Sequence, residues 1–222
     1  MKKYLMLLLF TSLSPCIFAN SLEEMMASPE EVIAGNSIND FANIWWQWTY
    51  SMPQEVSPIR DLTGENCHQG QSGDVWFLAG GYGSSKIKRT CEIPAGKYIF
   101  FPVINMAYWA AKEGALTCEQ AKKLAGLNNA QLLSIDIELD SIKASNPAHT
   151  RLSSEKCFNI FALAPANAHA YNAYPSASDG YWVMLKPLAK GKHILKFQAK
   201  YNREKGAYSK MAQDIEYELN IQ

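Results

Sequence analysis

Apolar side chains recur every three or four residues near the start of the chain, which predicts an amphipathic helix there. The stripe consists of Ile38, Phe41, Trp45, Trp48 and Met52. Ser37 and Asp40 fit an N-terminal cap with an acid in the first turn, and Pro53 ends the helix. A second, shorter helix is expected over residues 117–124, stopped near Gly126, because its first residues fit a capping box.

Most of the remaining chain consists of short apolar or alternating runs between glycines and prolines, which is the pattern of β-strands and turns. The first two strands are expected to form a hairpin around a turn at residues 80–85. Residues 165–179 are expected to form a long loop. The predicted strands are residues 75–79, 87–93, 98–104, 133–142, 181–185, 193–201 and 214–221.

This succession of short strands predicts a mainly β fold. The sequence has neither a βαβ rhythm nor an internal repeat, so we expect an antiparallel β-sandwich with two short helices packed on it. Residues 37–222 are enough for a single domain of this kind. Residues 20–36 are expected to form a polar, partly loose N-terminal segment in front of it.

Residues 1–19 have the organisation of a secretory signal peptide: two lysines, a short apolar run and Ala19 at the cleavage point. The apolar run is too short to cross a bilayer, which takes about 20 residues. A lipoprotein would use Cys16 as its modified residue, but Pro15 fits such a processing site poorly. We therefore predict export to the periplasm or the medium, with a mature chain that begins near Asn20.

Charge and hydropathy narrow the classes of partner. The chain has 21 basic and 21 acidic side chains, and removal of the leader takes away only two lysines, so the mature protein would be slightly acidic. We predict no nucleic-acid partner, because such a partner normally requires a basic face. No stretch after the leader is apolar enough for a transmembrane segment.

The cysteines that would remain after cleavage are even in number: Cys67, Cys91, Cys118 and Cys157. In an exported chain this predicts two disulfides. Three pairings are possible, and we favour Cys67–Cys91 with Cys118–Cys157 because each closes a local loop. No metal site is predicted, since no cysteine pair has the C-x-x-C spacing. No cofactor is predicted either, since the glycines at 80–83 lack the spacing of a phosphate-binding loop.

Several motifs follow one another in a fixed order along the chain. They are Trp-Trp-Gln-Trp at 45–48, Gly-Gln-Ser-Gly-Asp-Val-Trp-Phe-Leu-Ala-Gly at 70–80, and Pro-Ala-Gly-Lys followed by Phe-Phe-Pro-Val-Ile-Asn at 94–105. This series resembles a group of secreted bacterial proteins of unknown function, and the resemblance covers most of the mature chain. It implies export and a shared fold, but no activity. The chain departs from the group at Asp140-Ser141, where an Asp-Gly turn would be typical.

Aromatic side chains outside the core stripe indicate a binding surface. Trp46 and Tyr50 lie one helical turn apart and off the stripe. The glycine-rich loop after the helix carries Asp61, His68 and Gln71, and its polar side chains could fold back over the same face of the helix. We predict that these five residues bind a small molecule, a glycan or a protein. The competing interpretation is that the aromatic rings close one end of the core.

No catalytic motif is present, so binding is favoured over catalysis. One competing hypothesis is a secreted hydrolase that uses Asp61, His68 and Asp74. Another is a structural protein that interacts with the envelope. Carboxylates at every second residue from 136 to 140 have a spacing that could hold a cation or a glycosidase acid pair. Their alternation with leucine and isoleucine favours the solvated face of a strand instead.

Overall fold

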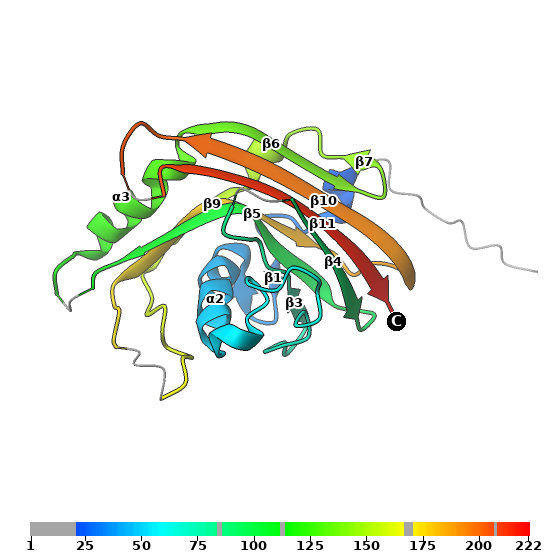
Figure 1. Ribbon diagram of the computed structural model, residues 1–222, viewed down its shortest axis with the longest axis horizontal. Coiled ribbons are helices and arrows are strands. Elements are labelled where there is room, and N and C mark those ends of the chain that lie inside the picture. Colours follow the sequence, from blue (N-terminus) through cyan, green and yellow to red (C-terminus); the bar gives the residue numbers. More distant parts are fainter. Residues whose placement is uncertain (1–20, 84–85, 112–113, 167–170, 207) are drawn as a thin grey trace, which may run out of the picture.

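The computed structural model describes residues 21–83, 86–111, 114–166, 171–206 and 208–222, so the predicted signal peptide lies outside the described residues. Two sheets and a helix form three layers (Figure 1). A five-stranded outer sheet packs on one face of a four-stranded central sheet, and α2 (Ile38–Tyr50) packs on the other face. The expectation of a mainly β sandwich with short packed helices is therefore confirmed.

The outer sheet is built from β4 (Lys86–Ile93), β6 (Leu132–Leu139), β7 (Ile142–Lys143), β10 (Gly191–Asn202) and β11 (Lys210–Ile221). Its strand order is β4-β11-β10-β6-β7. In β4, β10 and the second half of β11, buried side chains alternate with more exposed ones. One face of this sheet therefore belongs to the core and the other to solvent.

The central sheet is built from β3 (Val75–Phe77), β5 (Tyr98–Trp109), β8 (Arg151–Ser153) and β9 (Ser176–Leu185), in the order β3-β5-β9-β8. All residues of β9 are buried, because the strand lies in the middle layer and is covered on both faces. β9 begins within the segment predicted as a long loop, so that prediction is wrong for residues 176–179.

Two strand pairs are parallel, which the antiparallel expectation did not include. β4 runs parallel to β11, and β3 runs parallel to β5. The predicted hairpin between the first two strands is wrong, because β3 and β4 belong to different sheets. The connection after β3 crosses to the outer sheet, where the Gln213 side chain accepts from Gly81 N at 3.1 Å and donates to Gly81 O at 2.6 Å.

The main core lies between the two sheets. Phe101 of β5 stacks on Phe197 of β10 with ring centroids 4.9 Å apart, and both side chains are fully buried. A second apolar cluster lies between the central sheet and α2, where the α2 stripe meets Phe100, Trp182 and Met184. The central sheet is thus apolar on both faces, as expected for the middle layer of three.

Helix α2 begins as its sequence predicts. The Ser37 side chain accepts a hydrogen bond from Asp40 N at 3.2 Å, and the Asp40 carboxylate accepts one from Ser37 N at 3.1 Å. This capping box satisfies two backbone donors that the first turn leaves free. Trp45 and Trp48 of the predicted stripe are buried against the central sheet, which anchors the helix there.

Helix α3 (Cys118–Asn129) also begins with its predicted capping box, but it runs past Gly126, where we expected it to stop. Gly126 instead provides a close approach to the central sheet: a Cβ atom there would lie 3.3 Å from Asp179 Oδ2. Asp179 is buried and forms an ion pair with Arg151 at 3.1 Å, and Arg151 also donates to Gly126 O. This contact holds α3 against β9.

The N-terminal segment packs on the sheets from residue 21 onward. Leu22 in the short helix α1 (Leu22–Met25) is fully buried in the main core. The backbone then follows the end of β9 through hydrogen bonds from Ala27 N to Met184 O and from Lys186 N to Met25 O, both 2.8 Å. A small hairpin of β1 (Val32–Ile33) and β2 (Asn36–Ser37) leads into α2.

Both predicted disulfides are present. Cys67–Cys91 joins the glycine-rich loop to β4, and Cys118–Cys157 joins the start of α3 to the segment before β9. The loop carrying Cys67 follows a 3-10 turn, η1 (Gln54–Val56), and Gly64 of this loop lies directly against β4. A Cβ atom at Gly64 would lie 2.0 Å from Thr90 O, and φ is +97° there, so only glycine fits.

Candidate functional site

An aromatic cavity of about 270 Å³ opens between α2, the central sheet and the loops above them. We refer to it as the aromatic cavity. Its walls come from segments far apart in the sequence, so it exists only in the folded chain. It is lined by Trp45, Trp46, Thr49, Tyr50, Met52, Gln54, Ser57, Ile59, Arg60, Gly80, Gly81, Tyr82, Asn105, Met106, Ala107, Trp109, Tyr208 and Met211.

Two of the five predicted binding residues, Trp46 and Tyr50, lie in this lining. Their rings are nearly parallel, with centroids 6.4 Å apart and planes at 19°, because the residues are one helical turn apart. The Tyr50 ring forms T-shaped contacts with Trp109 of β5 at a centroid distance of 6.1 Å and with Phe161 at 5.0 Å. These ring contacts hold the aromatic wall of the cavity in a fixed arrangement.

The indole N–H groups of this wall are already used inside the protein. Trp45 Nε1 donates to Leu78 O at 2.9 Å, and Trp46 Nε1 donates to Ser178 Oγ at 3.1 Å. Trp109 Nε1 donates to the Tyr171 hydroxyl at 3.1 Å. These bonds fix the orientation of each ring, and a molecule in the cavity meets apolar ring surface instead of indole donors.

The cavity carries little charge. Arg60 is the one charged residue in the described lining, and its guanidinium lies 6.0 Å from the Tyr82 ring centroid at the exposed rim. Burial, together with the neighbouring phenols of Tyr82 and Tyr208, raises the pKa of Tyr50 to about 12. Tyr50 is therefore a neutral phenol at physiological pH, and the interior of the cavity is uncharged.

Asn105 of β5 is the polar exception in this apolar lining. The residue is 9% exposed, and its Nδ2 donor is buried without a hydrogen-bond partner in the described residues. A buried donor without a partner costs about 1–3 kcal/mol. In the sequence this asparagine stands out only as the last residue of the Phe-Phe-Pro-Val-Ile-Asn motif, and no binding role was predicted for it.

The other three predicted binding residues, Asp61, His68 and Gln71, lie outside the lining of the aromatic cavity. Gln71 holds the loop to β3: it donates to Cys67 O and Phe77 O, and its Oε1 accepts from Phe77 N at 2.9 Å. The structure therefore does not bring all five residues together. Gln71 acts as a clamp between a loop and a strand edge.

Asp61 organises the turn that follows it. Its carboxylate accepts hydrogen bonds from Thr63 N and Asn66 N, both at 2.8 Å. Burial raises the pKa of Asp61, but these backbone hydrogen bonds outweigh burial and hold the pKa below its usual value. Because its carboxylate accepts hydrogen bonds from two backbone N–H groups, Asp61 stabilises the loop conformation, as is typical of aspartate in turns.

The geometry of the loop does not support the hypothesis of a hydrolase that uses Asp61, His68 and Asp74. His68 is exposed, and its Nε2 atom lies 3.1 Å from Gln69 Nε2. Within the described ranges, no hydrogen bond or ion pair joins the His68 ring to Asp61 or Asp74. The same ranges contain no group of three His, Cys, Asp or Glu side chains that could hold a metal ion.

The three carboxylates between residues 136 and 140 lie on the outer sheet and its turn, and each has a basic partner. Asp136 pairs with Lys143 at 3.3 Å, and Glu138 pairs with Lys196 at 3.0 Å. Asp140 Oδ2 lies 2.6 Å from His193 Nδ1. This cross-strand pairing is typical of a solvated sheet face, which agrees with the interpretation that we favoured.

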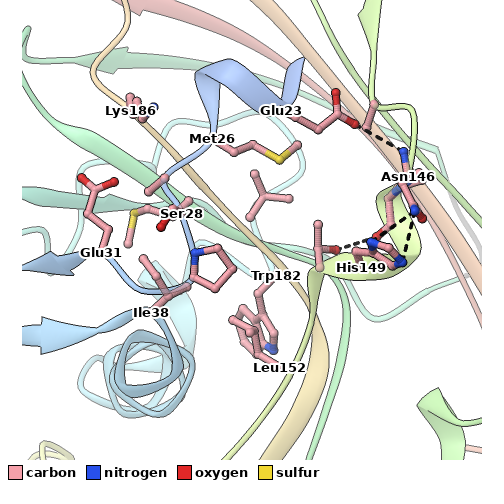
Figure 2. Close-up of a pocket in the computed structure, with 17 residues that line it drawn as sticks. Glu23, Met26, Ser28, Glu31, Ile38, Asn146, His149, Leu152, Trp182 and Lys186 are labelled. Carbon is pink, nitrogen blue, oxygen red and sulfur yellow. Dashed lines mark hydrogen bonds between the residues drawn. The ribbon is translucent and has the colours of Figure 1, made fainter. Parts of the chain in front are cut away.

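A second cavity, the N-terminal groove, has a volume of about 460 Å³ and lies between the N-terminal segment, the 3-10 turn η2 (Pro147–Thr150) and β9. Figure 2 shows Trp182 and Leu152 close together, with Asn146 and His149 to one side and Glu31 to the other. The polar rim is internally paired: Glu23 accepts from Asn146 N at 3.3 Å, and the amide of Asn146 lies 3.1 Å from His149 Nε2.

Comparison with known proteins assigns no family. No protein-family model matches the chain, and no curated protein is significantly similar to it. None of the helices in the described part of the chain is both long and apolar enough to cross a membrane. The functional conclusion therefore depends on the geometry of the two cavities.

Proposed function

We propose that the chain is an exported binding protein and that its aromatic cavity takes a small ligand with a flat, apolar body. The composition of the lining supports this proposal: Trp46, Tyr50 and Trp109 present ring surface to an uncharged space of about 270 Å³. Pockets with apolar walls and few polar groups are typical ligand sites, and this cavity is slightly smaller than their usual lower limit of about 300 Å³, which suits a small ligand. Export is supported by the two disulfides, which form and persist in oxidising compartments.

An apolar ligand suits this lining better than a glycan does. A sugar ring stacks on aromatic faces, but its hydroxyls also need several polar partners, because each unpaired hydroxyl loses hydrogen bonds to water. In the described lining, the indole donors are bonded within the protein, and Thr49 Oγ1 donates to Trp46 O at 2.8 Å. The resemblance to secreted bacterial proteins is compatible with this proposal and names no ligand.

Equilibrium dialysis with naphthalene and with methyl glucoside tests the proposal. We expect the protein to bind naphthalene and not the glucoside. Ala107→Leu places three extra carbon atoms in the cavity and should reduce naphthalene binding at least tenfold. Ala189→Leu, at an exposed site outside the lining, is the matched control and should bind as the unchanged protein does.

Three results would overturn the proposal. They are glucoside binding without naphthalene binding, no binding of either probe, and equal loss of naphthalene binding in the two leucine variants. Thermal melts of both variants accompany the dialysis, and the comparison is made at a temperature where each variant is folded.

A further inference from the structure

The mouth of the aromatic cavity carries the two most exposed large hydrophobic side chains in the described residues. Tyr208 is 76% exposed and Tyr82 is 71% exposed, although both also line the cavity. Both tyrosines therefore lie at the boundary between the cavity and the surrounding solvent, where a partner of the protein would meet them.

The two tyrosines lie on neighbouring turns. Tyr208 lies on the turn between β10 and β11, and its carbonyl accepts a hydrogen bond from the Asn128 side chain of α3 at 3.2 Å. Tyr82 lies on the connection between β3 and β4, where a Cβ atom at Gly83 would lie 3.1 Å from Met211 Cγ. Because Met211 follows Tyr208 by three positions, this contact brings the two turns side by side.

Basic side chains accompany this pair of tyrosines. Residues 200–210 contain four basic residues and one acid, although the whole chain has as many acidic as basic side chains. Lys205 and Lys210 are exposed, and neither takes part in an ion pair within the described residues. Arg60 adds a further positive charge beside Tyr82. We refer to Arg60, Tyr82, Lys205, Tyr208 and Lys210 as the cationic tyrosine rim.

A phospholipid surface matches both parts of this rim. Tyrosine is typical of the interface between water and hydrocarbon, because its ring is apolar and its hydroxyl is polar. Lysine and arginine at the same depth attract anionic headgroups. An acidic protein would satisfy the charges as well. However, an apolar ligand concentrates in a bilayer, so only a lipid surface would also place the mouth of the cavity at a source of ligand.

We propose that the cationic tyrosine rim docks the mouth of the aromatic cavity on a bilayer that contains anionic phospholipids. The rings of Tyr82 and Tyr208 enter the headgroup layer, and the three basic side chains of the rim contact lipid phosphates. This inference rests on the proposed function and deepens it, because it names the surface at which the apolar ligand enters and leaves.

Cosedimentation of the full mature chain with vesicles tests the inference. One set of vesicles contains phosphatidylcholine and phosphatidylglycerol in equal parts, and the other contains phosphatidylcholine alone. We expect the protein to bind the mixed vesicles roughly a hundredfold more tightly, since each of three basic side chains contributes about fivefold near an anionic surface. Added salt should weaken this binding, because it screens exposed charges.

Paired lysine variants test the charged part of the rim. Lys205→Gln combined with Lys210→Gln should weaken binding to the mixed vesicles about twentyfold. Lys156→Gln combined with Lys190→Gln removes two exposed lysines outside the rim, so it is the matched control and should bind as the unchanged protein does.

Paired tyrosine variants test the aromatic part. Tyr82→Ser combined with Tyr208→Ser should weaken binding to the mixed vesicles about tenfold, because the rings no longer enter the headgroup layer. Leu163→Ser combined with Tyr174→Ser removes exposed apolar side chains outside the cavity lining and is the control. Thermal melts establish that each variant is folded at the temperature of the assay.

The inference is overturned if the unchanged protein does not bind the mixed vesicles, if it binds both kinds of vesicle equally, or if the control variants lose as much binding as the rim variants. Binding to polyglutamate without binding to vesicles would assign the rim to an acidic protein and would also overturn it. Naphthalene dialysis without vesicles separates the two proposals. A protein that binds naphthalene but not the vesicles keeps the proposed function and loses this inference, whereas one that binds the vesicles but not naphthalene loses the proposed function.

Discussion

Trp46 and Trp48 lie two positions apart in α2 but have different surroundings. Trp48 is 3% exposed, packs against Phe77 at 5.5 Å and donates to Gln69 O. Trp46 is only partly buried and forms a wall of the aromatic cavity. Two positions correspond to about 200° around the helix axis, so one turn of α2 supplies both core and cavity from different faces.

This difference predicts unequal effects of alanine substitution. Trp48→Ala should lower the free energy of unfolding by about 3–5 kcal/mol, because it leaves a cavity in the core. Trp46→Ala should cost clearly less, but it should weaken naphthalene binding because the ligand loses a ring surface. Thermal melts and dialysis on both variants check this. Equal melting temperatures would show that Trp46 is simply part of the core.

Tyr50 predicts a specific dependence of stability on pH. Its pKa in the folded chain is about 12, mainly through burial, whereas an unfolded tyrosine has a pKa near 10. A raised pKa means that the phenol contributes its full stability below about pH 10 and loses it as the pH rises through 12. The unchanged protein should therefore lose stability relative to Tyr50→Phe over this range.

Denaturant unfolding of both proteins at pH 9 and at pH 11.5 measures this difference. An absorbance titration of the phenols at 295 nm gives an independent value: burial also raises the pKa of Tyr181, Tyr201 and Tyr217, so Tyr50→Phe should remove one of several late-titrating phenols. Normal titration of Tyr50 near pH 10 would contradict the buried cavity wall that we describe.

At the scale of elements, the disulfides hold irregular segments to regular ones. Cys118–Cys157 closes 39 residues and Cys67–Cys91 closes 24. On the chain-entropy model, replacing either pair with serines should lower the free energy of unfolding by about 3–4 kcal/mol. Urea unfolding measures the loss, and peptide mapping without reduction tests the pairing. A Cys67–Cys157 peptide, or four free thiols in exported material, would contradict it.

The helix starts were predictable because their signals are local. Each capping box occupies four consecutive residues, and its hydrogen bonds form within those four. Strand partners were less predictable, because register depends on distant segments. β3 and β4 follow one another in sequence, yet β3 pairs with β5 and β4 with β11. Leu133 continues the alternation of β6 but is 61% exposed, since the pairing shifts near Lys200.

The same limit applies to the candidate site. Trp46 and Tyr50 could be found because their helical spacing sets them apart from the core stripe. Asn105 and Met211 could not, because strands far along the chain bring them to the cavity. The polar loop residue Gln71 lies outside the cavity lining and bonds to the loop backbone. In sequence, an amide side chain that satisfies a loop backbone looks the same as one that binds a ligand.

At the scale of the whole molecule, the N-terminus joins the fold soon after the expected cleavage point. We predict that the mature protein begins near Asn20 and carries no lipid, which mass spectrometry of envelope protein would establish. A diacylated N-terminal Cys16 would contradict this. Leu22 is fully buried only two residues further on, so Leu22→Ala should cost about 2–5 kcal/mol of stability.

The parallel pairing of β4 with β11 has a consequence for biogenesis. Partners such as Glu92 and Asn220 are 128 positions apart, so a chain that emerges N-terminus first exposes β4 long before its neighbour exists. Cys67 and Cys91 emerge early, and the disulfide between them would join β4 to the preceding loop before β11 is available to pair with it. Without that bond, an unpaired apolar edge would invite intermolecular strand pairing. Oxidative folding catalysts should therefore influence the yield of this protein more than its final stability.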